Sequence, residues 1–119
     1  MLKSNVMVIA FNRTVVGREQ QAVAFFSQTL ELYAKWQAAG RIQSFEEVIL
    51  SPHRGDMNGL VLIRGDADKL TALRQDDEFM AMVYQSGYFL EGFGVIEAYS
   101  GDVLRSGMQD WGAVVAGLK

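Results

Sequence analysis

The hydrophobic and polar positions of the chain divide it into alternating strand-like and helix-like segments. Residues 5–11 form a short apolar, β-branched run, which predicts a strand buried on both faces. Residues 18–39 repeat apolar side chains at about 100° per residue, which predicts a helix with one buried face. The residues expected on that face are Ala22, Phe25, Phe26, Thr29, Tyr33 and Trp36. Gly40 follows as a helix terminator, and Glu31 and Lys35 have the i,i+4 spacing of an ion pair.

The middle of the chain predicts a β-hairpin. Residues 41–51 alternate between apolar and polar side chains, but the apolar set changes face near Glu46 and Glu47, which predicts a bulge. Residues 52–56, Pro-His-Arg-Gly-Asp, are typical of a turn. Residues 57–64 then predict the second strand of the hairpin.

The next part of the chain predicts two short helices and a strand. Asp66 or Asp68 can cap the first helix. Residues 76–78, Asp-Asp-Glu, are expected to begin the second, since acidic side chains are favourable at the positive end of a helix dipole. Gly87 is expected to end that helix, and residues 88–99 alternate as a strand.

A final helix is predicted over residues 102–118. Its apolar side chains at helical spacing are Leu104, Met108, Trp111, Val115 and Leu118. Three glycines in this segment cost about 1 kcal/mol each relative to alanine, so the helix is expected to need tertiary support.

The element order defines the expected fold class. It reads β-α-β-β-α-β plus a C-terminal helix in one domain over residues 1–119, an α+β, ferredoxin-like arrangement with an antiparallel four-stranded sheet. The helices would cover one face of the sheet. Since no remaining segment is large enough to cover the other face, a second copy of the chain is expected there, which makes the protein a homodimer.

With this order the chain resembles the dimeric α/β-barrel superfamily over nearly its whole length. The resemblance rests on element order, on size and on three local motifs. These are Val16-Gly17-Arg18-Glu19 at the start of the first helix, the turn at residues 52–56, and Leu-Arg-Gln-Asp-Asp-Glu-Phe over residues 73–79. It implies that two ferredoxin-like subunits pack sheet to sheet and close into a barrel, with a ligand in a cleft between sheet and helices.

The superfamily does not fix an activity. It includes cofactor-independent monooxygenases, haem-degrading enzymes, lactone isomerases and uncharacterised bacterial proteins, and this chain resembles the last group most. No catalytic residue set carries over position by position, so the resemblance implies an architecture and a ligand location rather than a reaction.

Composition and charge narrow the classes of function. The chain is 50% hydrophobic and 21% charged, which is typical of a folded domain. Its 11 Lys and Arg against 14 Asp and Glu give a net charge of −3, without the basic excess of a nucleic-acid-binding protein. The absence of cysteine excludes disulfides, thiolate catalysis and cysteine-ligated metals. The apolar run near the N-terminus is too short for a secretory leader and no stretch is long enough for a membrane span, so we expect a cytoplasmic protein that binds no membrane.

Two residues are candidates for proton transfer. His53 is the sole histidine and therefore the sole side chain with an ordinary pKa near neutrality, and a surface turn residue is the alternative interpretation. Glu91 lies between Phe89 and Phe93 on one face of the predicted strand, where burial would raise its pKa. A solvated strand face is the alternative for Glu91. One histidine excludes a three-histidine metal site, and we expect no metal and no resident cofactor.

Four further residues are candidates for ligand binding. Tyr33, Trp36 and Tyr84 are large aromatic side chains suited to an apolar pocket, although such residues more often belong to the ordinary core. Arg64 is a candidate to bind an anionic group, with surface solvation or an ion pair as the alternative.

Three functions follow from these candidates. The first is a homodimer that binds a small apolar or aromatic molecule between sheet and helices. The second is a cofactor-independent monooxygenase or isomerase that uses His53 or Glu91 as general base. The third is a haem-binding or haem-degrading protein with His53 as the iron ligand.

Overall fold

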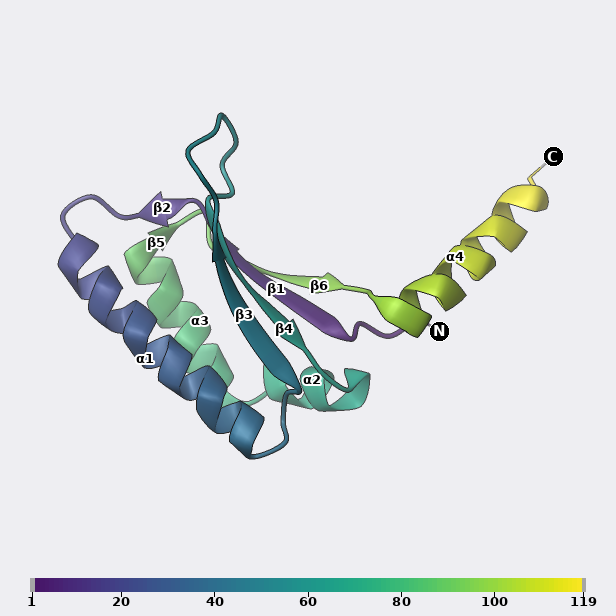
Figure 1. Cartoon of the computed structure of the whole chain (residues 1–119), viewed down its shortest axis with the longest axis horizontal. Helices are drawn as coiled ribbons and strands as arrows, with labels where there is room; N and C mark the ends of the chain where they lie inside the picture. Colours follow the sequence, from purple (N-terminus) through teal and green to yellow (C-terminus); the bar gives the residue numbers. More distant parts are fainter. Residues whose placement is uncertain (1, 119) are drawn as a thin grey trace.

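A four-stranded antiparallel sheet forms the centre of the computed structural model, which describes residues 2–118 (Figure 1). Its strands are β1 (Val6–Phe11), β3 (Ser44–Ile49), β4 (Gly59–Arg64) and β6 (Gly94–Ala98), in the order β3-β4-β1-β6 across the sheet. A short ribbon joins β2 (Arg13–Thr14) to β5 (Leu90–Glu91). The helices are α1 (Glu19–Ala38), α2 (Ala67–Arg74), α3 (Asp77–Phe89) and α4 (Gly101–Ala116). The chain is therefore an α+β protein.

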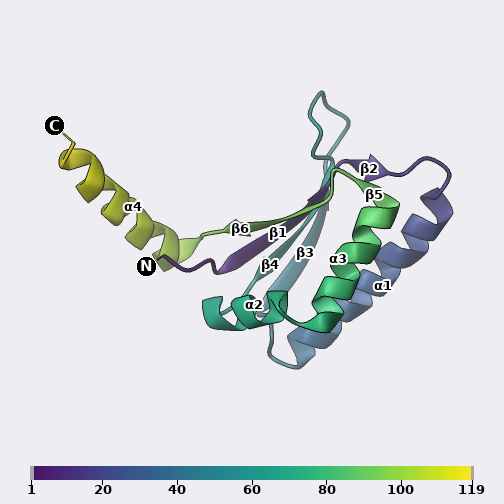
Figure 2. The ribbon, with the colours of Figure 1, turned by 180° about the vertical axis from the view of Figure 1, so that it is seen from behind.

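The hydrophobic core lies on one side of this sheet. Alternation along β1 directs Met7 and Ile9 toward the helices and Val8 and Ala10 to the opposite face. Helices α1 and α3 run side by side across the first face, and α2 lies at one end of it (Figure 2). The largest fully buried side chains are Trp36, Tyr33, Met7, Ile63, Leu70 and Leu73.

Helix α1 has the predicted buried face. Of the six residues expected there, five are buried and Phe26 is half-buried. The predicted pairing of Glu31 with Lys35 is wrong, because Lys35 Nζ lies 2.9 Å from Glu78 Oε2 on α3. Glu78 also accepts a hydrogen bond of 3.0 Å from Trp36 Nε1, so one carboxylate serves two residues of α1 across the helix pair.

The predicted bulge at Glu46 and Glu47 is wrong. Strands β3 and β4 pair residue by residue from Ser44 opposite Arg64 to Ile49 opposite Gly59. The change of apolar face instead reflects an edge strand with one core residue on its helix side. That residue is Phe45, whose ring centroid is 5.7 Å from that of Tyr33, whereas Ile49 is 67% exposed.

The single strand predicted over residues 88–99 is also wrong. Helix α3 passes through Gly87 and ends at Phe89, whose ring packs 5.0 Å from that of Phe25. The chain then turns at Gly92, where φ is +65° and a Cβ would lie 3.0 Å from that of Asn12. The predicted strand is thus divided into a helix end, β5 and β6, because packing of Phe89 on α1 outweighs local alternation.

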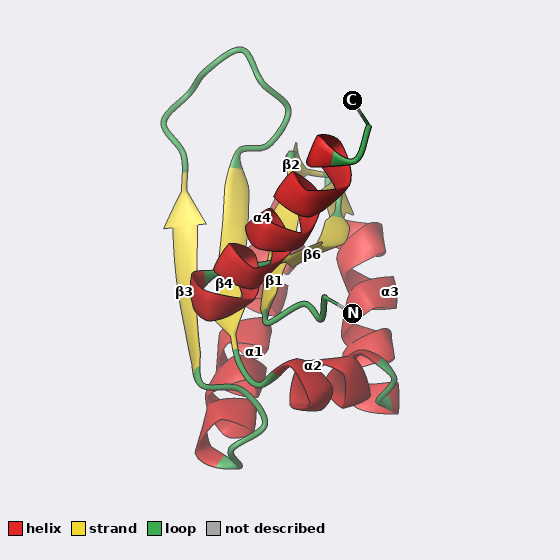
Figure 3. Cartoon of the chain, turned by 90° about the vertical axis from the view of Figure 1, so that its right-hand side faces the viewer, coloured by secondary structure: helices red, strands yellow, loops and turns green. Residues whose placement is uncertain are grey.

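Helix α4 forms where the sequence predicts it but has no buried residue. It projects from the body on the side of the sheet opposite to α1 and α3 (Figure 3). The described residues, 2–118, therefore do not bury this helix as the prediction of tertiary support requires. No helix in residues 2–118 is long and apolar enough to span a membrane.

Candidate functional site

A cavity of about 30 Å³ lies between the sheet and helix α1, with room for one or two water molecules. It is lined by Ile9, Phe11, Ala22, Phe25, Phe26, Thr29, Tyr33, Val61, Ser86, Leu90 and Phe93. Polar side-chain atoms come from three of these residues, Thr29, Tyr33 and Ser86. Four of the lining side chains are half-buried: Phe11, Phe26, Leu90 and Phe93.

Local sequence explains how this space arises. Ala22 is the smallest side chain on the buried face of α1 and leaves room beside Phe25. Across the sheet, the ring of Phe11 lies over Gly59, where a Cβ would be 2.3 Å from Phe11 Cζ. A glycine on β4 is therefore required for Phe11 to reach the cavity.

Two of the three polar side chains of the cavity, Thr29 and Ser86, can accept hydrogen bonds. Thr29 Oγ1 donates to the Phe26 carbonyl oxygen at 2.7 Å, and Ser86 Oγ donates to the Met82 carbonyl oxygen at 2.7 Å. Each hydroxyl proton is thus used within its own helix, and the oxygen lone pairs remain. Burial raises the pKa of Tyr33 to about 12, so its phenol is neutral at physiological pH. The three polar side chains of the cavity wall are therefore all uncharged at physiological pH.

Two pairs of residues connect the segment before α1 with the end of α3 and with β5. Arg13 Nε lies 2.6 Å from Glu91 Oε2 across the β2–β5 ribbon. The Arg18 guanidinium stacks 3.8 Å from the ring centroid of Tyr88, and Arg18 Nη1 donates to the Tyr88 carbonyl oxygen at 2.9 Å. The start of α1 is thereby held against the end of α3.

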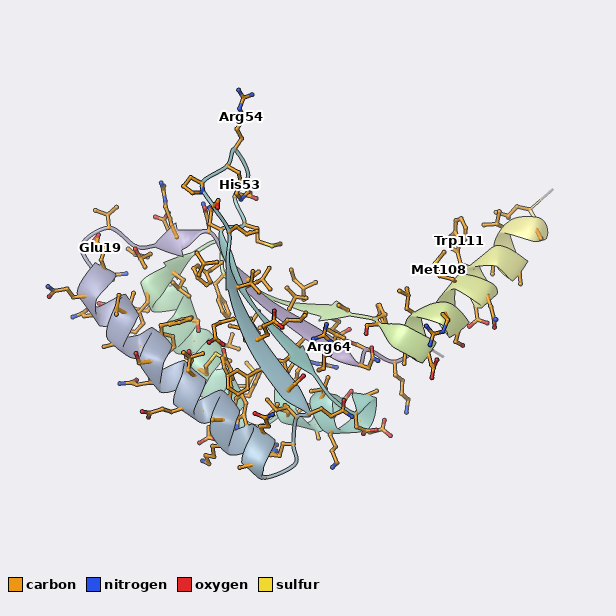
Figure 4. All side chains as sticks on the ribbon, in the orientation of Figure 1. Glu19, His53, Arg54, Arg64, Met108 and Trp111 are labelled. Carbon is orange, nitrogen blue, oxygen red and sulfur yellow. The ribbon has the colours of Figure 1, made fainter. Side chains whose placement is uncertain are left out.

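His53 lies away from the cavity, in the exposed loop between β3 and β4 (Figure 4). Its Nδ1 accepts from the Gly55 N–H at 2.9 Å, and its Nε2 is 2.8 Å from the Met57 carbonyl oxygen, to which it donates. A Cβ at Gly55 would lie 2.6 Å from His53 Cε1, so the ring is folded back over its own loop. Both ring nitrogens therefore make hydrogen bonds that stabilise the conformation of this loop.

Glu91 does not line the cavity either, although its neighbour Leu90 does. The predicted setting of Glu91 between Phe89 and Phe93 on one strand is wrong, since Phe89 belongs to α3 and Gly92 turns the chain. The Glu91 carboxylate instead pairs with Arg13 at the surface.

The four predicted ligand-binding residues are scattered. Tyr33 lines the cavity, whereas Trp36 is buried in the core with its N–H bonded to Glu78. Tyr84 is 73% exposed on α3, and Arg64 is exposed at the end of β4. Within residues 2–118, no group of three or more His, Cys, Asp or Glu side chains is placed to hold a metal ion.

Sequence reasoning missed most of the cavity wall, including Phe11, Phe93 and Ser86. A signal for Phe11 was present: it ends a buried strand, and Gly59 begins another. Their opposition depends on the register of β1 with β4, which the sequence does not reveal.

Comparison with known proteins identifies a structural neighbour. No protein-family model matches the chain, and no curated protein matches it in sequence. The crystal structure of PA3566 from Pseudomonas aeruginosa superposes with a TM-score of 0.55 at 12% sequence identity, covering 85% of this chain and 98% of that one. At this identity the similarity is one of fold, which supports the α+β architecture.

Proposed function

We propose that the chain is a homodimeric, ferredoxin-like α/β barrel that binds a small apolar or aromatic molecule between its sheet and helices. The observation that carries the ligand part is the cavity itself, which has four phenylalanines in its wall and hydroxyl acceptors on α1 and α3.

The arrangement of the sheet supports the dimeric barrel. Strands β1 and β4 lie at its centre, and the connecting helices α1 and α3 cover one face, as a split βαβ arrangement requires. The opposite face, called the open face here, carries no helix of the body. Its apolar members are Val6, Val8, Ala10, Val48, Leu60, Leu62, Ile96 and Ala98. A second sheet stacked on this face would complete a two-layer core.

The proposed ligand needs more room than the cavity has at rest. A cavity of about 150 Å³ is known to admit benzene, whereas this one measures about 30 Å³. The side chains whose rotation would enlarge it are the half-buried ones in its wall, Phe11, Phe26, Leu90 and Phe93. Binding is therefore coupled to rotamer changes among these residues.

Binding without proton transfer is favoured over the catalytic alternatives. A general base must reach the reacting group, and neither His53 nor Glu91 is among the lining residues. Haem ligation by His53 would break the hydrogen bonds that both its ring nitrogens make within the loop.

The test compares phenol with toluene as probes, titrated into the protein and followed by NMR shifts. We expect phenol to bind more tightly, because its O–H can donate to the hydroxyl acceptors of the cavity. Ala22→Leu fills the space and should weaken phenol binding by about tenfold or more, which is about 1.4 kcal/mol. Val23→Leu is the matched control, since Val23 is 66% exposed on the same helix. Binding that survives Ala22→Leu unchanged would contradict the ligand site.

A further inference from the structure

Helix α4 is amphipathic, and none of its residues is buried by the rest of residues 2–118. Its apolar stripe consists of Val103, Leu104, Gly107, Met108, Trp111, Val114, Val115 and Leu118, and no charged residue interrupts it. Trp111 is 63% exposed and Met108 is 56% exposed. An isolated helix of this length is marginal in water, and Gly107 and Gly112 weaken it further. Tertiary or quaternary contacts must therefore stabilise α4.

The apolar stripe and the open face of the sheet border the same space. Figure 4 shows Met108 and Trp111 projecting from α4 toward the side onto which the open face looks. Figure 3 places α4 on that side of the sheet, away from α1 and α3. Leu2 and Tyr99 join the base of the stripe to the body, lining a groove with Leu104, Met108 and Trp111. The stripe and the open face therefore look onto the same side of the molecule.

The size of the unburied surface is large enough for a stable dimer. The chain exposes 7741 Å², against about 6,400 Å² for a folded monomer of 13.2 kDa. The excess of about 1,300 Å² exceeds the roughly 800 Å² that each partner buries in a standard interface. The radius of gyration of 16.4 Å similarly exceeds the value of about 13.5 Å for a compact domain of this length.

The charges near the stripe and the open face are compatible with a second copy of the chain. On the open face, Glu46 and Arg64 lie diagonally on the adjacent strands β3 and β4, so a stacked two-fold copy can bring each charge near the opposite one. The polar side of α4 carries Asp102, Arg105 and Asp110, with Arg105 paired to Asp102. That side lacks the basic excess with which an amphipathic helix binds an anionic membrane.

We propose that α4 is an exchanged arm, which packs its apolar stripe on a second copy of the chain while the open faces stack. This inference rests on the homodimer proposed above and adds to it a second contact region. Each subunit then stabilises the C-terminal helix of the other.

The experiment measures dimerisation of the full chain by sedimentation over a range of concentrations. Met108→Asp and Trp111→Asp place a charge on the stripe and should each raise the dimer dissociation constant by about 100-fold or more, since both copies are affected. Gln109→Asp, on the polar side of the same helix, is the matched control and should leave it unchanged. Because α4 has no buried residue, these variants should keep the folded body.

Trp111 provides an independent readout. The difference between the fluorescence of the natural chain and of Trp111→Phe isolates Trp111 from Trp36, which is 1% exposed. Iodide should quench the Trp111 component in dilute monomer, and protection should appear in parallel with dimerisation.

The outcomes separate this inference from the proposed dimer. A dimer whose affinity is insensitive to both aspartate variants overturns the exchanged arm and leaves the stacked sheets. A chain that is monomeric at all concentrations overturns both, and protection of Trp111 in that monomer would show α4 folded back on its own sheet. Stripe-dependent binding of the monomer to phosphatidylglycerol vesicles would overturn the inference in favour of a membrane.

Discussion

Helices α1 and α4 are both long and amphipathic, yet only α1 is packed. Helix α1 spans 20 residues and buries five of them against the sheet and α3, whereas α4 spans 16 residues and buries none. The difference lies in what each helix can reach within one chain. In the chain, helix α1 lies between β1 and β3, two strands of the sheet that it covers. Helix α4 follows the last strand, and the face of the sheet that carries helices is covered by α1, α2 and α3. An amphipathic pattern therefore predicts a buried face but not the molecule that buries it.

The largest expected difference in stability is between truncation of the tryptophan in α1 and truncation of the tryptophan in α4. Trp36→Ala removes a buried indole and the donor to Glu78, and should lower the free energy of unfolding by about 3–5 kcal/mol. Trp111→Ala should change it by less than about 0.5 kcal/mol in dilute monomer. Urea denaturation at low protein concentration measures both. Equal losses would show that α4 is packed within the chain after all.

The next effect is alkaline destabilisation through Tyr33. Burial raises its pKa from 10.0 to about 12, so the folded state holds the proton more tightly than the unfolded state. The protonated Tyr33 therefore contributes fully to the free energy of unfolding below pH 10, and this contribution is lost as the pH rises toward 12. The loss should be about 2–3 kcal/mol by linkage.

Tyr33→Phe isolates this contribution. Tyr33→Phe should lose less of its free energy of unfolding at alkaline pH than the natural chain. Tyr84→Phe, at a position that is 73% exposed, should lose as much as the natural chain. Denaturant titrations from pH 9 to pH 12 compare the three chains. An identical alkaline profile for Tyr33→Phe and the natural chain would contradict the assignment.

A smaller effect, a loss of stability at acidic pH, is expected from the carboxylates near the contact between α1 and α3. Hydrogen bonds from Lys35 and Trp36 lower the pKa of Glu78, and the Glu78 N–H and Arg41 lower that of Asp76. These carboxylates stabilise the folded state above their ordinary pKa values, and that stability should be lost as the pH falls below about 4.5.

Substitution of Glu78 separates charge from hydrogen bonding. Glu78→Gln keeps an acceptor for Trp36 Nε1 and should remove mainly the acid dependence. Glu78→Ala also leaves the buried indole N–H unpartnered and should be the more destabilising of the two. Thermal melts at pH 7 and pH 4 make the comparison, and equal stabilities of the two variants at pH 7 would contradict it.

The smallest effect concerns the glycines of α4. A Cβ at Gly112 meets nothing within 4 Å, so Gly112→Ala should stabilise the helix by about 0.5–1 kcal/mol. Gly107→Ala should gain less, because its Cβ would lie 3.0 Å from Leu2 Cδ2. Hydrogen exchange of the α4 amides reports each gain. Greater protection from Gly107→Ala than from Gly112→Ala would be inconsistent with the contact to Leu2.

Much of the secondary structure was predictable because it depends on local pattern. The periodicity of α1, the caps Asp66 and Asp76, and the glycine after α1 each have a local physical cause. The division of residues 88–99 was not predictable, because it depends on the contact of Phe89 with Phe25 in a distant helix. The β2–β5 ribbon was missed for the same reason: two residues carry no periodicity, and their pairing is long-range.

The candidate site was less predictable than the fold. Tyr33 lines the cavity because it lies on the buried face of α1, and its role in ligand binding stays a prediction. His53 was a candidate because of its chemistry, and Glu91 because of its predicted position between Phe89 and Phe93. The tertiary structure places His53 in a loop and Glu91 in a surface ion pair, and neither location follows from the local sequence.

The sequence by itself determined the α+β class, the helix faces and the absence of cysteine chemistry, because these follow from composition and from patterns within a few residues. The tertiary structure decided which residues surround the cavity, since Phe11, Ser86 and Phe93 meet there from separate parts of the chain. It also decided that the stripe of α4 is left outside the body. The hydrophobic effect is non-directional, so the pattern of α4 does not specify a partner surface, and the fold brings none within its reach in residues 2–118.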